Sequence, residues 1–568
     1  MGGVRVADIE SLPVSRRLHR VFASRLALAT LLGLALAAAG CGKPPTRVSV
    51  GDVEQVLHRG NSSDPQELDP HIVQGVPEHR ILQSLIENLV TEDPKDLRPI
   101  PGQAERWDIS PDGTVYTFHL RPGIRWSNGD PVTAQDFVRS YQRALTPSLG
   151  SEYAYMYFVM KGAEDYFKGK SRDFSTVGAK ALDDRTLQIT LNGPTPYFLS
   201  LLNHYSWWPV HLPTLAKHGD PYQRNNRWTR PGNFVGNGPF VLTKWGVGQV
   251  IAVKKNPLYW NAANVKLSAI HFHPIESSDT EERSFRSGQL HVTGDVPLSK
   301  IPIYRKEKAH LLRIDPYLGA YFYRINTTRP QFKDKRVRQA LAMAVDRKAI
   351  VERITRGGQL PAFYFTPPDT VGYTSRTSLR YDPEAARALL AAAGYPGGKD
   401  FPAFDILYNT SEAHKSIAEA IQQMWKRELG IDVRLLNQEW KVYLDTEKRL
   451  DYQVSRAGWI GDYPDPSTFL ETFLSDSGNN RTGWKNAEYD RLLKEAARLG
   501  DQKTRYELFQ KAEAIFLDEL PIIPIYHYTR VYLIQPSVRG WHPTILDHHP
   551  WQHVWLAAPP ERIAAAKP

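Results

Sequence analysis

The stretch RAGWIGDY, residues 456–463, says more about the fold of this chain than any other segment, and it runs into Pro464-Asp465-Pro466. On its own, the part from Asp462 to Pro466 has the composition of a polar turn, because proline fixes φ and aspartate favours turns. Segments with helical periodicity flank it on both sides; they cover residues 417–429, 489–499 and 505–520. The stretch therefore belongs to a structured, helix-rich region.

Further out, strand-like and helix-like segments alternate irregularly. A helix is expected to begin at Thr133 as N-cap with Asp136 at its N3 position, and Gly394 stops another. The expected strands are 115–120 (VYTFHL) and 186–191 (TLQITL), and the other expected helices cover 80–90, 336–352 and 384–393. Strands mixed with helices of this length predict an α/β protein with more than one sheet.

Composition excludes several classes of protein. The chain has 568 residues, of which 41% are apolar, so it can bury large cores and is expected to form two to four domains. The formal net charge is +10, but no run of Lys and Arg is long enough to predict nucleic-acid binding. A single cysteine excludes an internal disulfide, a CxxC redox pair and a cysteine-rich metal site.

The first forty residues have the pattern of an export signal. Arg16, Arg17, Arg20 and Arg25 precede an apolar run, residues 26–39, that is too short to span a bilayer comfortably. The run ends in LAAAGC, and small residues before Cys41 resemble a bacterial lipobox, in which the thiol is acylated. Ala38 stands where that pattern usually has leucine, and ordinary Ala-x-Ala cleavage is the alternative. We expect a signal peptide over 1–40, lipidation at Cys41, a tether over 41–52 and no later membrane span.

Motifs of catalysis and metal binding are missing from the sequence. HExxH, GxSxG and GxxxxGK[ST] do not occur. His549 and His553 are four residues apart, with His542 and His548 near, but Pro550 interrupts a helical register that would align them. The sequence therefore predicts a protein that is not an enzyme, with no metal and no cofactor, although a hydrolase without a recognisable motif remains an alternative.

Ten segments in colinear order are similar to one family. Besides residues 456–463 they are LDPH (68–71), AERW (104–107), TFHLR (117–121), WSNGDPVTA (126–134), KALDD (180–184), NGPF (237–240), KNPLYW (255–260), RVRQAL (336–341) and NQEW (437–440). Together they span nearly the whole mature chain, from about 54 to 556. The chain resembles the bacterial extracellular solute-binding proteins of the peptide/nickel type, and among them the periplasmic oligopeptide-binding proteins of ABC importers.

The resemblance implies an α/β fold of three domains in two lobes, with hinge closure of the periplasmic-binding-protein type. It assigns 53–86, 213–318 and 530–568 to the core domain of lobe 1, 87–212 to a domain inserted in that lobe, and 319–529 to lobe 2. Two connecting segments near 318 and 529 would hinge the lobes around a ligand.

The resemblance also implies a peptide-binding site. Asp462 matches the aspartate that pairs with the ligand ammonium, and a buried ammonium needs a charged partner. Arg456 matches the arginine that receives the carboxylate of a short peptide, and its guanidinium suits two oxygens. His414 matches a position used with longer peptides. The alternatives are a polar turn, a structural ion pair and a structural histidine, respectively.

The remaining implied contacts are aromatic or involve the backbone. Tyr153, Tyr317, Trp440 and Trp459 match positions that line the cleft, and Val76 matches a strand-edge residue that bonds ligand backbone. The chain also departs from the family in three places. Gln74 replaces a glutamate, Gly319 and Ile460 stand where relatives can carry a cysteine pair, and Gly294-Asp295 replaces a Tyr-Asn pair. Arg329 falls near a lysine used with shorter peptides.

The expected function is a non-enzymatic receptor that captures short peptides and delivers them to an inner-membrane ABC permease. The alternatives are capture of another ligand, such as a cell-wall peptide, haem or a nickel chelate, a secreted hydrolase, and an envelope interaction or chaperone-like protein that uses the same cleft.

Overall fold

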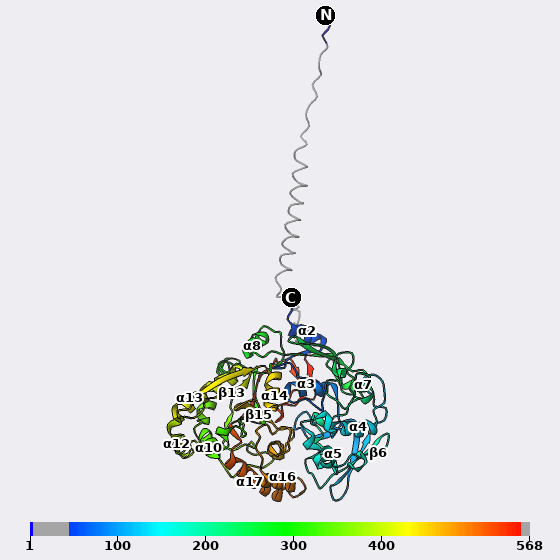
Figure 1. The fold of residues 1–568 in the computed structure, drawn as a ribbon. Coiled ribbons are helices and arrows are strands. Elements are labelled where there is room, and N and C mark those ends of the chain that lie inside the picture. Colours follow the sequence, from blue (N-terminus) through cyan, green and yellow to red (C-terminus); the bar gives the residue numbers. More distant parts are fainter. Residues whose placement is uncertain (4–44, 558–568) are drawn as a thin grey trace. The chain divides into compact units, whose positions relative to one another are not determined.

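The structure, a computed structural model, describes residues 1–3 and 45–557. The predictions of a signal peptide and of lipidation at Cys41 lie outside these residues. The segment from Arg47 onward forms one compact unit, and its helices and strands are shown in Figure 1. Within the described residues, no helix is both long enough and apolar enough to cross a membrane.

The tether expected over 41–52 is wrong for its last six residues, which are helical. Residues Arg47–Glu54 form helix α2, in which Gly51 and Asp52 are buried. Asp52 Oδ1 lies 3.3 Å from Nε2 of His291, which is also buried. The Lys/Pro/Thr/Arg composition of 43–50 suggested a tether because it lacks an apolar stripe, and only packing against distant residues reveals the helix.

Two four-stranded sheets come from the first 273 residues of the chain. One has the order β1-β10-β9-β8, and β1 and β10 are its parallel pair. The other is antiparallel, with the order β4-β5-β7-β6. The strands of the first are β1 (Val56–Gly60), β8 (Phe240–Gly246), β9 (Val250–Lys255) and β10 (Ala269–His273), and those of the second are β4 (Ala104–Ile109), β5 (Val115–Leu120), β6 (Ala179–Asp183) and β7 (Thr186–Thr190).

A six-stranded mixed sheet has the order β12-β16-β11-β15-β13-β14. Its strands are β11 (Leu312–Ile325), β12 (Leu360–Pro361), β13 (Phe404–Asn409), β14 (Val433–Gln438), β15 (Val454–Ile460) and β16 (Ile522–Leu533). Most of the RAGWIGDY stretch is thus strand β15, between β11 on one side and β13 on the other. The short strands β2 (Val90–Glu92) and β3 (Pro99–Pro101) form one pair, and β17 (Val538–Arg539) and β18 (Trp555–Leu556) form another.

The two longest strands, β11 and β16, pair antiparallel with an irregularity near the middle. Pro316 lies opposite Thr529, but the next paired residue of β11 is Ala320, opposite His527. Between these pairs, three residues of β11 (317–319) therefore lie opposite one residue of β16, Tyr528, a bulge that bends the pair locally. The bulge falls at the two points, near 318 and 529, that the resemblance marks as connecting segments.

The expected helices are present, with shifted ends. Asp136 Oδ2 accepts a hydrogen bond from the backbone N–H of Thr133 at 2.8 Å, so the predicted capping box starts α4. The helix expected over 80–90 is α3 (Val76–Leu85), and the one expected over 336–352 breaks after α10 (Lys335–Met343). The other longer helices are α4 (Ala134–Ala144), α8 (Ser278–Arg286), α12 (Pro383–Ala392), α13 (Glu412–Leu429), α14 (Trp440–Lys448), α16 (Ala487–Ala496) and α17 (Gln502–Glu519). The shorter ones are α5 (Ala163–Phe167), α6 (Phe198–Leu201), α7 (Leu212–Lys217), α9 (Ile301–Glu307), α11 (Arg347–Ala349) and α15 (Ser467–Leu470).

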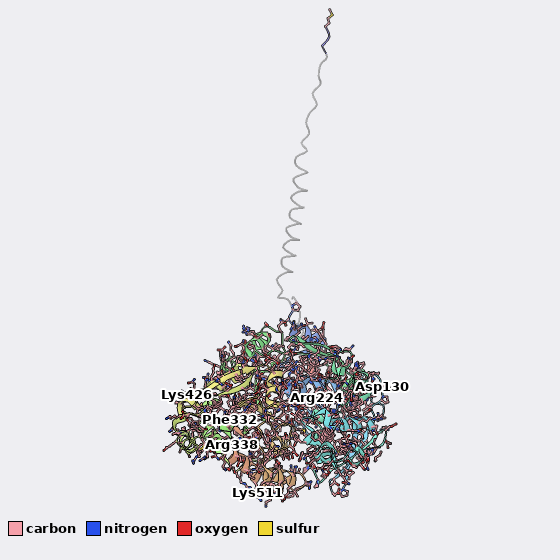
Figure 2. All side chains as sticks on the ribbon, viewed as in Figure 1. Asp130, Arg224, Phe332, Arg338, Lys426 and Lys511 are labelled. Carbon is pink, nitrogen blue, oxygen red and sulfur yellow. The ribbon has the colours of Figure 1, made fainter. Side chains whose placement is uncertain are left out.

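Helices α10, α12 and α13 pack together on the six-stranded sheet and lie side by side in Figure 1. The fully buried Trp425 of α13 anchors this layer, and its indole N–H donates to the Leu341 carbonyl of α10 at 2.9 Å. Arg338 of α10 donates to the carbonyl of Phe332 at 2.8 Å, and Figure 2 labels both residues. The first contact holds α13 to α10, and the second ties α10 to the turn that precedes it.

Candidate ligand-binding cavity

A cavity of about 800 Å³ lies within the part of the chain that the structure describes. Its walls come from segments far apart in the sequence, including the start of α3, the end of β15 and the middle of β16. All eight side chains predicted to bind a ligand line it: Val76, Tyr153, Tyr317, His414, Trp440, Arg456, Trp459 and Asp462. The structure therefore brings the predicted residues together, whereas their role in binding stays a prediction.

Asp462 lies two residues beyond the end of β15, and its side chain is 11% exposed. Its backbone N–H donates to Thr468 Oγ1 at 2.9 Å, which fixes the turn that the sequence suggested. The titratable group that faces its carboxylate is His204, whose Nε2 lies 3.4 Å from Oδ1. Among the described residues no Lys or Arg pairs with it, and burial raises the pKa of Asp462 well above its usual value.

Arg456 lies on β15, six residues before Asp462, and is held from several sides. Its Nη1 donates to Asn409 Oδ1 at 3.2 Å and its Nη2 to the Tyr528 hydroxyl at 2.8 Å. The guanidinium carbon lies 4.6 Å from the ring centroid of Tyr321, a cation–π contact. No carboxylate among the described residues pairs with it, and its buried Nε has no hydrogen-bond partner. A fixed arginine without a counter-charge suits an incoming carboxylate.

His414, in the first turn of α13, lies beside this arginine. Its Nδ1 is 3.4 Å from the hydroxyl of Tyr321, and the two rings have centroids 5.6 Å apart. Burial, and then the charge of Arg456, hold the pKa of His414 well below its usual value. The imidazole is therefore neutral and can act only as a hydrogen-bonding group at the arginine end of the cavity.

Aromatic rings cover much of the remaining wall. The ring of Tyr153 lies 4.4 Å from that of His204 and 6.2 Å from that of Trp459, measured between centroids. At another point Trp440 stacks on Tyr443 with centroids 5.7 Å apart. Rigid rings of this kind offer contact area at a low cost in conformational entropy. They leave the space between them open to side chains of different shapes.

Tyr317 completes the predicted aromatic set, and its ring lies edge-on to Tyr528 with centroids 5.9 Å apart. Because Tyr528 also accepts from Arg456, these two tyrosines connect the arginine end of the cavity to strand β11.

Val76 lines the cavity, but the expectation that it lies on a strand edge is wrong. It is the first residue of helix α3, directly after Gly75, whose φ of 115° only glycine adopts readily. The backbone N–H groups of a first helical turn have no intrahelical acceptor. Val76 can therefore still offer a backbone donor to a ligand, from a helix rather than from a strand. Pro77, which disfavours a strand interior, was the sequence signal for this.

Arg329 does not join the cavity. Its guanidinium donates to the backbone carbonyls of Tyr452 at 3.1 Å and Leu450 at 2.9 Å, so it ties down a loop. The structure instead brings in arginines that sequence reasoning missed, among them Arg481, Arg80 and Arg530. No sequence motif identifies these three arginines, because each lies in a different segment and only the fold places them on one cavity wall.

Arg481 shows how the departure at Gln74 is accommodated. Its Nη2 donates to Gln74 Oε1, a neutral acceptor. Its Nη1 lies 3.6 Å from Glu447, but Arg324 holds that carboxylate more closely, at 2.6 Å. At a second departure, Gly319 and Ile460 are directly opposed in the β11–β15 ladder, which places them side by side where relatives can carry a cysteine pair.

Two of the histidines near the C-terminus each contact a different carboxylate. His548 Nδ1 lies 2.9 Å from Glu92, and His549 Nε2 lies 3.0 Å from Asp547. Within the described residues, no group of three or more His, Cys, Asp or Glu side chains is arranged to hold a metal ion.

Comparison with known proteins gives one consistent family. The model of the bacterial extracellular solute-binding proteins, family 5 Middle, matches residues 98–481. The periplasmic oligopeptide-binding protein OppA of Salmonella typhimurium is 40% identical over 517 residues, which cover 89% of this chain and 93% of that protein. The crystal structure of Haemophilus influenzae OppA in complex with RPPGFSPFR has a TM-score of 0.84 at 34% identity, covering 89% of this chain and 99% of the other.

The murein tripeptide binding protein MppA of Escherichia coli matches in two forms. One structure has a TM-score of 0.83 at 35% identity and covers 88% of this chain and 98% of that one. The unliganded open form, also 35% identical, covers 89% and 97% but has a TM-score of only 0.60. These neighbours confirm the predicted α/β two-lobe fold of periplasmic binding proteins. The chain belongs to the bacterial extracellular solute-binding proteins of family 5.

Proposed function

We propose that this protein captures short peptides outside the cytoplasm and delivers them to an inner-membrane ABC permease. The observation that carries the proposal is that Asp462 and Arg456 line the same cavity and that each is buried without an opposite charge among the described residues. A zwitterionic peptide supplies both missing charges, its ammonium to the carboxylate and its carboxylate to the guanidinium. A ligand that lacks either the charged ammonium or the charged carboxylate can pair with only one of Asp462 and Arg456.

Recognition of this kind does not depend on peptide sequence. The terminal charges and the backbone are common to all peptides, and the aromatic walls accept varied side chains. The alternatives within the family, a cell-wall peptide, haem or a nickel chelate, share the fold, but haem lacks the ammonium that Asp462 requires.

The proposal includes closure of two lobes around the ligand. Lobe 1 would comprise 53–86, 213–318 and 530–568 with 87–212 inserted, and lobe 2 would comprise 319–529. The bulge between Pro316 and Ala320 lies where the lobes would connect. Two forms of one relative, MppA, differ in TM-score to this chain at equal identity, and the higher score belongs to the form not described as open. The present arrangement is then the closed one.

Contacts between the proposed lobes support a closed arrangement. Glu152 accepts from Lys448 and lies 3.1 Å from Arg224, which Figure 2 labels. Lys168 pairs with Asp476 at 2.5 Å. The Lys168 and Asp476 side chains are each about 30% exposed, so this pair contributes about 0–1 kcal/mol and can open without a large cost.

We further propose export to the periplasm or cell envelope, with membrane contact only through a lipid on Cys41, and action as a monomer. The protein would bind no nucleic acid, need no cofactor and catalyse no reaction. Relatives named as periplasmic support the location.

Isothermal titration of the purified mature chain with trialanine, N-acetyl-trialanine and trialanine amide tests the function. Free trialanine should bind, and each blocked peptide should bind at least about tenfold more weakly, since one charged contact is lost. Mass spectrometry of the recovered peptide should find it intact. Equal binding of all three peptides, or their hydrolysis, would reject a non-enzymatic receptor for zwitterionic peptides.

A further inference from the structure

Three arginines share one carboxylate beside the cavity. Asp547 Oδ2 lies 2.8 Å from Arg530 Nε, 3.1 Å from Arg80 Nη2 and 3.8 Å from Arg59 Nη2. All four side chains are less than one-tenth exposed, and Asp547, Arg80 and Arg530 line the cavity wall. Burial opposes ionisation of Asp547, but the arginines hold its pKa well below the usual value. Three positive charges thus face one negative charge.

The neighbouring titratable groups do not restore the balance. His549 bonds Asp547 at 3.0 Å, and burial lowers its pKa to about 4, so it is neutral. Burial, together with the charge of Asp295, raises the pKa of Glu281 to about 8, and its oxygens are occupied by the backbone N–H groups of Gly294 and Asp295. Asp295 itself is 60% exposed and lies 3.9 Å from Arg530, beyond hydrogen-bond distance. Asp315, which also feels the charge of Arg530, accepts a hydrogen bond from the Tyr532 hydroxyl at 2.7 Å and forms no ion pair with an arginine among the described residues. A buried positive excess therefore remains on this wall.

Arg530 is the member of the cluster whose free N–H donors can bind an anionic group in the cavity. Its Nε donates to Asp547, which fixes the plane of the guanidinium, and neither Nη has a hydrogen-bond acceptor among the described residues. Two residues earlier on β16, Tyr528 lines the same cavity and binds Arg456. Arg530 therefore lies near the end of the cavity at which Arg456 would take the terminal carboxylate.

We propose that Arg530 determines specificity by binding a second carboxylate of the ligand, so that the cavity favours peptides with an acidic side chain. The inference rests on the proposed function and adds a substrate class to it. Asp547 is the positioning residue that holds Arg530, and Asp295 is a competing carboxylate at the same guanidinium. An ion pair with two parallel N–H···O bonds forms when the acidic side chain reaches the Nη atoms.

Binding of matched tripeptides to the mature chain tests this. Glutamate and glutamine are placed in turn at each position of trialanine, because the two differ in charge but hardly in shape. At one position at least, the glutamate peptide should bind about tenfold more tightly than its glutamine partner, as one charge-assisted contact predicts. The same preference in C-terminally amidated peptides assigns the effect to the side chain. Its loss on amidation would show that Arg530 takes the terminal carboxylate, and would overturn the proposal.

Two variants and one control locate the effect. Arg530→Gln should reduce the glutamate-to-glutamine preference to about one, and Asp295→Asn should increase it, because the competing carboxylate is gone. Asp295 is exposed, so this second variant keeps the test open even if Arg530→Gln does not fold. Arg356→Gln, which removes an exposed arginine that also lines the cavity, should leave the preference unchanged.

The outcomes separate the two proposals. If trialanine binds but glutamate gives no advantage at any position, Arg530 has no role in specificity and the receptor function stands. If no tripeptide binds, trialanine included, the receptor function itself fails. A preference for glutamate that persists unchanged in both Arg530→Gln and Asp295→Asn would place the acidic subsite elsewhere.

Discussion

His204 Nε2 lies 3.4 Å from Asp462 Oδ1, and this imidazole cannot neutralise the carboxylate it faces. The other ring nitrogen, Nδ1, accepts from the backbone N–H of Ser206 at 3.3 Å. Burial, and then the proximity of His548, hold the pKa of His204 well below its usual value, so the ring carries no charge. The charge of an ionised Asp462 therefore has no partner until a ligand brings a cation. Ligand affinity should depend strongly on this carboxylate.

Replacement of Asp462 tests this dependence. Asp462→Asn keeps the shape of the side chain but leaves a buried ligand ammonium unpaired, a cost of about 3–5 kcal/mol. Trialanine affinity, measured by titration calorimetry, should fall by at least a hundredfold. Asp279→Asn, an exposed carboxylate that also lines the cavity, is the matched control and should bind normally. A weak effect at Asp462 would mean that the ammonium lies elsewhere.

Peptide binding should release a proton. Burial raises the pKa of Asp462 well above 3.8, so a fraction of the empty protein is protonated there, whereas a bound ammonium requires the ionised form. Affinity should therefore rise with pH from the usual aspartate range through the raised pKa. Calorimetry at pH 5.5 in two buffers with different ionisation enthalpies measures the proton directly. Asp462→Asn should abolish the release, and a buffer-independent heat in the unmutated protein would contradict the prediction.

A cluster of histidines beneath α2 should make the fold sensitive to acid. His58 donates its backbone N–H to His291 Nδ1 at 3.0 Å, and its own Nδ1 lies 3.2 Å from His273 Nε2. Burial, and then neighbouring histidines with Arg47, lower the pKa of His58 to about 3, and burial with Arg47 and His271 lowers that of His273 to about 4. The unfolded chain binds protons near pH 6.5, so it is favoured below that pH.

Stability should therefore be complete above about pH 6.5 and fall as the pH drops toward 4, by about 1.4 kcal/mol for each unit by which a pKa is lowered. Thermal unfolding followed by circular dichroism between pH 7.5 and 4.5 measures this. His273→Asn should flatten the dependence. A melting temperature that is constant over this range in the unmutated protein would contradict the prediction.

Ligand should close the two proposed lobes. Asp462 and Arg456 belong to the stretch 319–529 and Val76 and Tyr153 to the other lobe, so only the closed state makes both sets of contacts. A saturating tripeptide should reduce the radius of gyration measured by small-angle scattering and raise the melting temperature. The Asp462→Asn variant at the same peptide concentration is the control, and its radius of gyration should not decrease because it binds the peptide poorly. Proven binding with no compaction would mean that the lobes do not hinge.

Membrane attachment should depend on Cys41. The thiol falls at the position that a lipobox requires, after the apolar run of residues 26–39. Cys41→Ser should move the protein from the membrane fraction to the soluble fraction of the envelope, and mass spectrometry of the wild-type N-terminus should find acyl chains on residue 41. An unmodified N-terminus at another residue would support ordinary cleavage instead.

The sequence alone was enough for the local structure and for the identity of many cavity residues. The capping box at Thr133 and Asp136 and the strand 115–120 follow from local backbone preferences, which act within a few residues. The motif around Asp462 identified the family, because the residues of the buried strand and of the turn after it are adjacent in the sequence. For the same reason Arg456 and Trp459 could be named before the fold was seen.

Only the tertiary structure decided the features that depend on distant residues. Residues 47–54 became a helix because Asp52 packs against His291, and Val76 proved to start a helix rather than to edge a strand. The charge of the cavity wall is the clearest case. Arg80, Arg530 and Asp547 come from three segments. The lowered pKa of Asp547 and the free donors of Arg530 arise only when folding removes water and sets both guanidinium groups about 3 Å from the carboxylate.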